Sequence, residues 1–86
     1  MDDPLHLLDR DRPETPARRL LEGRVVRLAR EQLGLSQGEL ARRVGVRSTS
    51  IAKLEDGTRS IRAWTDAQLQ RFMVVLRQAH WDQHLN

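Results

Sequence analysis

The sequence contains no cysteine and no tyrosine, and it contains a single lysine. Without cysteine, neither a disulfide framework nor a thiolate metal site can stabilise this chain of 86 residues. No apolar run approaches the roughly 18 residues that a membrane-spanning helix requires. We therefore expect neither a disulfide-rich secreted protein nor a membrane protein, and we expect a location in the cytoplasm.

Charged residues make up 31% of the chain, but their two signs are unevenly distributed. Residues 1–16 hold three prolines and a net charge of −3, residues 17–63 a net charge of +6, and residues 64–86 are neutral. A concentrated arginine surface is typical of a phosphate-binding protein, although a solvated helical face has a similar composition. This division predicts an acidic, flexible N-terminal arm over residues 1–16 and one folded domain over residues 17–86.

The first helix of that domain is predicted to begin at Thr15-Pro16, with threonine as the cap and proline in the first helical position. It is predicted to end at Leu33, with Gly34 in a left-handed conformation after it. Gly23 lies inside this segment and marks either a close contact between helices or the true start of the helix. The apolar residues that share one face of the predicted helix are Leu21, Val25, Leu28 and Ala29.

Two short helices are predicted next. Ser36 and Glu39 have the spacing of a capping box, in which each side chain bonds the backbone amide of the other residue. Gly45 ends this helix, and a second short helix is predicted over residues 48–55. Two short helices joined by a glycine-containing turn are typical of a helix-turn-helix. Because neither is long enough to persist alone in water, both must pack on the first helix.

A last helical pattern covers residues 64–86. Its apolar stripe consists of Leu69, Phe72, Met73 and Leu76. Further apolar residues lie off this stripe, and they exceed what so small a core is expected to cover. We therefore expect this segment to join two copies of the chain through Phe72, Val75 and Trp81. The alternative is that these residues form ordinary fourth and fifth helices on the core of one copy.

The central motifs resemble those of a known family. The residues that carry the resemblance are Arg30, Leu35 to Ala41 (LSQGELA), Gly45-Val46 and Ser50 to Gly57 (SIAKLEDG). Together they resemble the Cro/C1-type (XRE) helix-turn-helix family. The resemblance implies an all-α, lambda-repressor-like bundle of four to five helices that binds double-stranded DNA. It also implies an ion pair between Arg30 and Glu55, which would pin the end of the second short helix to the first helix.

The resemblance further implies that the helix over residues 48–55 lies in the major groove of DNA. The residues implied in base reading are Ser48, Thr49, Ala52 and Lys53. The residues implied in phosphate contacts are Gln37, Arg47, Thr58, Arg59 and Arg62. Two positions depart from the family pattern. Arg47 occupies a place that often holds a serine or threonine cap, so this cap is missing or shifted to Ser48, and Ile61 lies near a usual proline.

We therefore expect a transcriptional regulator, most simply a homodimeric repressor that reads a DNA site with two-fold symmetry. The alternative is a protein-interaction module of the antitoxin or antiactivator type, whose partner is a toxin or another regulator. Neither an enzyme nor a cofactor is expected, because no spacing suggests a nucleophile with its base. His80 and His84 lie four residues apart, but two surface histidines are the simpler interpretation, and no metal site is expected.

Overall fold

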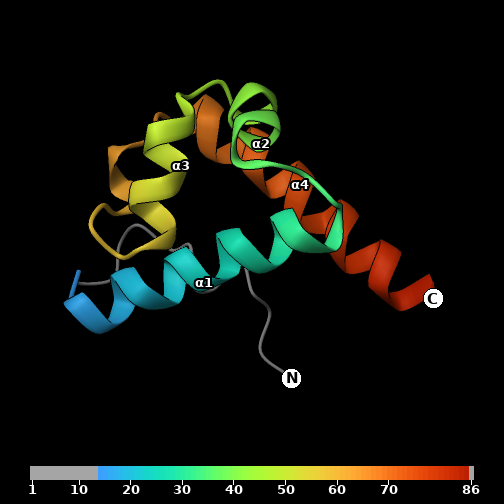
Figure 1. The fold of residues 1–86 in the computed structure, drawn as a ribbon, viewed down its shortest axis with the longest axis horizontal. Coiled ribbons are helices and arrows are strands. Elements are labelled where there is room, and N and C mark those ends of the chain that lie inside the picture. The colour runs from blue at the N-terminus through green and yellow to red at the C-terminus, as the bar shows by residue number, and fades with distance from the viewer. Residues whose placement is uncertain (1–13, 86) are drawn as a thin grey trace.

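The computed structural model describes the backbone of residues 14–85 and the side chains of residues 14–79. Within this part the elements are α1 (Pro16–Gln32), α2 (Gln37–Val44), α3 (Ser48–Glu55), the 3-10 turn η2 (Ile61–Ala63) and α4 (Asp66–Leu85). The described part contains no strand, and the predicted all-α fold is confirmed (Figure 1). Most of the predicted arm over residues 1–16 lies outside the described residues.

The first helix begins where local signals in the sequence predicted, and it ends one residue before the predicted end at Leu33. Thr15 Oγ1 accepts a hydrogen bond of 3.1 Å from Arg18 N, and Pro16 occupies the first helical position. Proline suits this position because its missing N–H would have no partner within the helix. After the helix ends at Gln32, Gly34 has a φ of +67°, a left-handed conformation that glycine adopts without strain.

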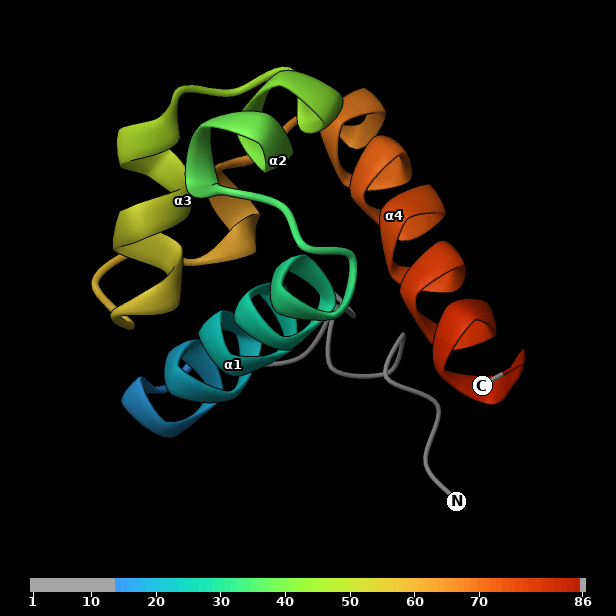
Figure 2. The ribbon, with the colours of Figure 1, turned by 45° about the vertical axis from the view of Figure 1, so that its right-hand side comes forward.

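Each helix packs against two others: α1 contacts α3 and α4, and α2 contacts the same two helices. Figure 2 shows the α2–α3 pair above α1, with α4 along the side of the bundle. The four helices and η2 enclose one hydrophobic core. Its most deeply buried residues are Val26, Ala29, Leu40, Val44, Ile51, Leu54, Ile61, Phe72 and Ala79. The short helices are therefore held by tertiary packing rather than by their own stability.

The inward face predicted for α1 is wrong for two of its leucines. Leu21 is 45% exposed and Leu28 is 53% exposed, whereas Val26 and Ala29 are buried. The helix is rotated relative to the prediction because its contact with the bundle runs along smaller residues and one glycine. Spacing alone could not locate this face, since α1 has apolar residues on more than one side.

That glycine, Gly23, lies within α1 and marks a close contact between helices. A Cβ atom added to it would overlap the carbonyl oxygen of Leu54 and lie 3.0 Å from the carbonyl oxygen of Glu55. Both carbonyls belong to the last turn of α3. Glycine at this point therefore lets the backbones of α1 and α3 approach closely, which settles the two alternatives that the sequence left open.

The fourth helix corrects the expectation that Phe72 and Val75 face a second copy. Phe72 is fully buried and Val75 is 3% exposed, so both lie in the core of a single chain. The core has room for them because α4 packs across both α1 and α2. Val74 is the exposed large apolar residue in the described part of α4, at 61%. The side chain of Trp81 lies outside the described residues.

Candidate nucleic-acid interface

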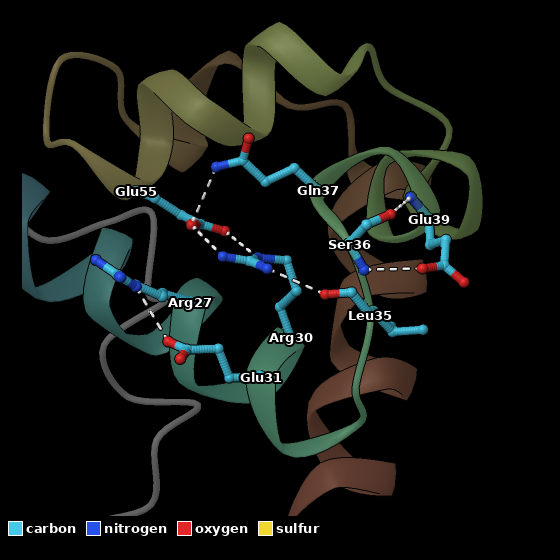
Figure 3. A network of polar contacts seen from close by, with 8 residues as sticks. All are labelled: Arg27, Arg30, Glu31, Leu35, Ser36, Gln37, Glu39 and Glu55. Carbon is cyan, nitrogen blue, oxygen red and sulfur yellow. Dashed lines mark hydrogen bonds and ion pairs between the residues drawn. The ribbon is translucent and has the colours of Figure 1, made fainter.

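Helix α2 begins with the predicted capping box. Ser36 Oγ accepts a hydrogen bond of 3.1 Å from Glu39 N, and Glu39 Oε1 accepts one of 2.9 Å from Ser36 N (Figure 3). The bond from the Ser36 amide favours the ionised carboxylate and lowers the pKa of Glu39. Two amides at the start of α2 thereby gain partners, and the first residue of the helix is fixed.

The turn between α2 and α3 depends on Gly45. This residue has a φ of +88°, and an added Cβ atom would lie 2.6 Å from Arg71 Nη1. The amides of Gly45 and Val46 both donate to the carbonyl oxygen of Ala41, at 2.8 and 3.0 Å. Because these bonds close the end of α2 within two residues, they fix the angle at which α3 leaves the turn.

Helix α3 has one buried face and one exposed face. Ile51 and Leu54 are fully buried and hold the helix on the core. Arg47 is the N-cap residue and makes no side-chain capping bond, so the cap is missing rather than shifted to Ser48. The other face consists of three exposed residues and one half-buried residue: Ser48, Thr49, Lys53 and Ala52. The four residues predicted to read bases therefore lie together.

A partly buried ion pair joins α1 and α3, and a residue of α2 bonds to it. Arg30 Nε and Nη2 donate to the two carboxylate oxygens of Glu55 at 2.8 and 2.9 Å (Figure 3). Arg30 Nη1 also donates to Leu35 O at 3.0 Å, and Gln37 Nε2 donates to Glu55 Oε1 at 3.3 Å. The hydrogen bond to Glu55 raises the pKa of Arg30. The structure thus contains the ion pair that the sequence predicted, with Gln37 as an additional partner.

The segment after α3 folds back onto that helix. The amides of Thr58 and Arg59 donate to Lys53 O at 2.9 and 3.2 Å. Asp56 Oδ1 accepts a bond of 2.8 Å from Thr58 N. Hydrogen bonding by the side chain and then by the amide of Thr58 lowers the pKa of Asp56. Arg59 Nη1 then reaches Ser50 Oγ at 3.3 Å. These contacts hold one cationic side chain against the side of α3.

A family model described as Helix-turn-helix matches residues 26–63, from the second half of α1 to the end of η2. This range contains α2, the glycine turn, α3 and both partners of the Arg30–Glu55 ion pair. The matching model is that of the Cro/C1-type helix-turn-helix (XRE) family. The family predicted from the sequence is confirmed, although no curated protein and no solved structure gives a significant match.

Helix-turn-helix domains of this family are DNA-binding regulatory domains. In the described part of the chain, no helix is long and apolar enough to cross a membrane. The described side chains also include no group of three or more histidine, aspartate and glutamate residues placed to hold a metal ion. The side chains of His80 and His84 lie outside this described part.

The residues predicted to contact phosphates come from several elements of the XRE domain. Arg47, Thr58, Arg59 and Arg62 are all exposed. Arg47 and Arg59 line one surface depression together with Ser50, between the turn, α3 and the start of α4. The guanidinium groups before and after α3 therefore border the same hollow, although they are twelve positions apart in the sequence.

Besides Arg59, two further residues predicted to contact phosphates already have protein partners. Gln37 is half-buried, and its amide donates to Glu55 as described above. Arg62 Nε lies 3.9 Å from Glu14 Oε2, and both side chains of this ion pair are partly exposed. Gln37 is thus the first residue of α2 and also bonds this helix to Glu55 of α3.

Sequence reasoning missed one buried polar residue of the domain, Glu22. It is 2% exposed, and its carboxylate accepts hydrogen bonds from Ser60 and from the amide of Ile61. One signal for it was present in the sequence. The XRE family usually has a proline, which lacks an N–H group, near the position of Ile61. Ile61 has an N–H group, and this group requires an acceptor when it is buried.

Proposed function

We propose that this chain is a sequence-specific DNA-binding transcriptional regulator that places α3 in the major groove. The observation that carries the proposal is the division of α3 into a fully buried face and a polar, exposed face. A major groove about 12 Å wide admits one helix, and its base edges present distinct donor and acceptor patterns. In this proposal Lys53 pairs with guanine, while Ser48 and Thr49 donate or accept and Ala52 contacts a base through its methyl group.

The proposed phosphate contacts surround α3. Arg47 precedes the helix, and Thr58 and Arg59 follow it within a segment that is bonded back to Lys53. Arg62 and Gln37 complete the set in this proposal. The net charge of +6 over residues 17–63 supports electrostatic attraction to the DNA backbone. Phosphate contacts fix the register of the protein on DNA, and α3 then reads the bases.

We further propose that the protein binds as a homodimer and represses transcription in the cytoplasm. One recognition helix contacts only a few base pairs, so two half-sites about one helical turn apart would raise specificity. Since Phe72 and Val75 are buried, exposed residues other than these would join the two copies. Repression requires no additional surface, because a protein that occupies an operator excludes other proteins from it.

The proposed function is tested by the salt dependence of binding to duplex DNA. We expect the logarithm of the association constant to fall with the logarithm of salt concentration, by about 0.9 for each neutralised phosphate. A dimer should give a slope of several units in a fluorescence anisotropy titration, with a protein-to-duplex ratio of two to one. No binding at low salt, or a flat salt response, would contradict the proposal.

Base reading and phosphate contact are separated by alanine substitutions. The best site is first selected from random duplexes. On that site, Lys53→Ala and Thr49→Ala should each lower affinity by about 1–3 kcal/mol where a bidentate contact is lost, and base preference should relax. Arg59→Ala should instead weaken binding to all sequences similarly and make the salt slope shallower. Equal losses on every sequence for all three variants would show that α3 does not read bases through these residues.

One observation favours a second candidate function, that of a protein-interaction module of the antitoxin or antiactivator type. Three leucines of α1 are exposed: Leu20 at 59%, Leu21 at 45% and Leu28 at 53%. Exposed apolar clusters are typical of protein–protein contacts. If duplex binding proves absent or insensitive to salt, this second function becomes the better one, with a toxin or another regulator as the partner.

A further inference from the structure

Glu22 is a buried carboxylate that connects α1 to the chain entering η2. In the described part of the chain, Glu22 and Ser60 are the two buried polar residues. Glu22 Oε1 accepts hydrogen bonds of 3.0 Å from Ser60 Oγ and of 3.0 Å from Ile61 N. Its second oxygen lies 3.4 Å from Arg18 Nε. The carboxylate is therefore compensated on both oxygens, as a buried charge requires.

The hydrogen bonds continue from Glu22 into η2. Ser60 Oγ donates to Glu22 and accepts a bond of 3.1 Å from Arg62 N, so it acts as the cap of the 3-10 turn. The Ile61 amide is the first of this turn and has no acceptor within the turn itself. Through these bonds, the Glu22 carboxylate fixes the backbone of residues 60–62. Glu22 lies 38 positions before Ser60 in the sequence.

The segment between α3 and η2 is consequently held at both ends. At one end, the amides of Thr58 and Arg59 bond to Lys53 O in the last turn of α3. At the other end, Glu22 holds Ser60 and Ile61. Arg59 is the last residue of the first attachment and directly precedes the second, and its exposed side chain reaches Ser50 on α3. The position of the Arg59 guanidinium relative to α3 depends on both attachments.

We propose that Glu22 is a positioning residue for DNA binding, which holds the segment 58–62 so that Arg59 meets the phosphate backbone without prior ordering. This inference rests on the proposed function. Glu22 is buried and touches no DNA; it acts through Ser60 and Ile61. Binding by a segment that is already ordered avoids the entropy cost of fixing its side chains at the moment of association.

The central test replaces Glu22 with leucine, which removes the acceptor and leaves both donors buried. Duplex affinity, measured at a temperature at which the variant remains folded, should fall about three- to tenfold, the loss expected for ordering one long side chain. The loss should be equal for all sequences, and the salt slope should become shallower. In Glu22→Leu combined with Arg59→Ala, affinity should equal that of Arg59→Ala alone.

Glu31→Leu is the matched control. It is the same substitution on the same helix, it changes the net charge equally, and the Glu31 side chain is 54% exposed in its pair with Arg27. We expect it to leave duplex affinity unchanged or slightly raised. Comparison with this variant separates the loss of positioning from the electrostatic gain that follows removal of any acidic residue.

Rescue distinguishes positioning from a general loss of stability. Adding Ile61→Pro to Glu22→Leu removes the orphaned N–H group and fixes the backbone at the first position of η2. Ser60 has φ −100° and ψ 155°, which is the conformation that a residue before proline adopts. We expect most of the lost affinity and the original salt slope to return. If Glu22→Leu does not fold, Ser60→Ala removes one donor and should give the smaller loss in the same direction.

The outcomes are distinguishable. If the unaltered protein binds no duplex, the proposed function is wrong and the role of Glu22 in it falls as well. If the unaltered protein binds duplex DNA, but Glu22→Leu and Ser60→Ala bind with the same affinity and salt slope, Glu22 is not a positioning residue. Recovery by Ile61→Pro, together with the equality of the two Arg59→Ala variants, would support the inference.

Discussion

Replacing Glu55 with alanine is expected to lower the free energy of unfolding by about 2–3 kcal/mol. The Arg30 side chain is 16% exposed and the Glu55 side chain 7%, so the pair is largely shielded from water. Removal of the carboxylate would leave a partly buried guanidinium with Leu35 O as its remaining partner in the network drawn in Figure 3. Urea denaturation followed by circular dichroism would measure this loss.

The matched control for this pair is Arg27–Glu31. This pair also joins an arginine to a glutamate, with 3.0 Å between Arg27 Nε and Glu31 Oε1, and both residues lie in α1. Its side chains are 63% and 54% exposed. Since exposed pairs are screened by water, Glu31→Ala should cost at most about 1 kcal/mol. The double variant Arg30→Met with Glu55→Leu should recover most of the stability lost in Glu55→Ala, because neither charge remains buried alone. Equal costs for Glu55→Ala and Glu31→Ala would contradict this account.

Replacing Gly23 with alanine should lower the free energy of unfolding by about 3 kcal/mol, the upper part of the range for overpacked cores. The added methyl group would overlap the Leu54 carbonyl oxygen, which belongs to a helix backbone and cannot rotate away. To relieve the overlap, α1 and α3 would have to separate, and the distance between Arg30 and Glu55 would increase. Thermal denaturation of this variant, with hydrogen exchange of the α3 amides, would measure the effect.

The sign of this effect is diagnostic, since helix propensity alone predicts that alanine stabilises a helix by about 1 kcal/mol relative to glycine. Gly38 in α2 is the matched control. A Cβ atom added there would have Ser36 Oγ at 3.9 Å as its nearest neighbour, which is ordinary contact. Gly38→Ala should therefore be neutral or stabilising. A stabilising Gly23→Ala would mean that α1 and α3 do not approach as closely as described.

The sequence by itself determined where the helices begin and end, and it indicated the family. The signals are local: Thr15 caps α1 through a residue three positions away, and Ser36 and Glu39 cap each other over the same separation. Gly34 and Gly45 end helices because few other residues adopt a left-handed backbone without strain. Such interactions involve neighbours in the chain, so their residue types and spacing suffice to predict them.

Only the tertiary structure decided which face of each longer helix is buried. Leu21 and Leu28 proved exposed and Phe72 and Val75 buried, because both helices have apolar residues on more than one side and periodicity cannot choose among them. The choice depends on contacts between distant residues. Glu22 meets Ile61 across 39 positions, and Gly23 meets the end of α3 through backbone carbonyls that no residue type specifies. A sequence pattern records the spacing within one helix, whereas burial depends on the helix packed against it.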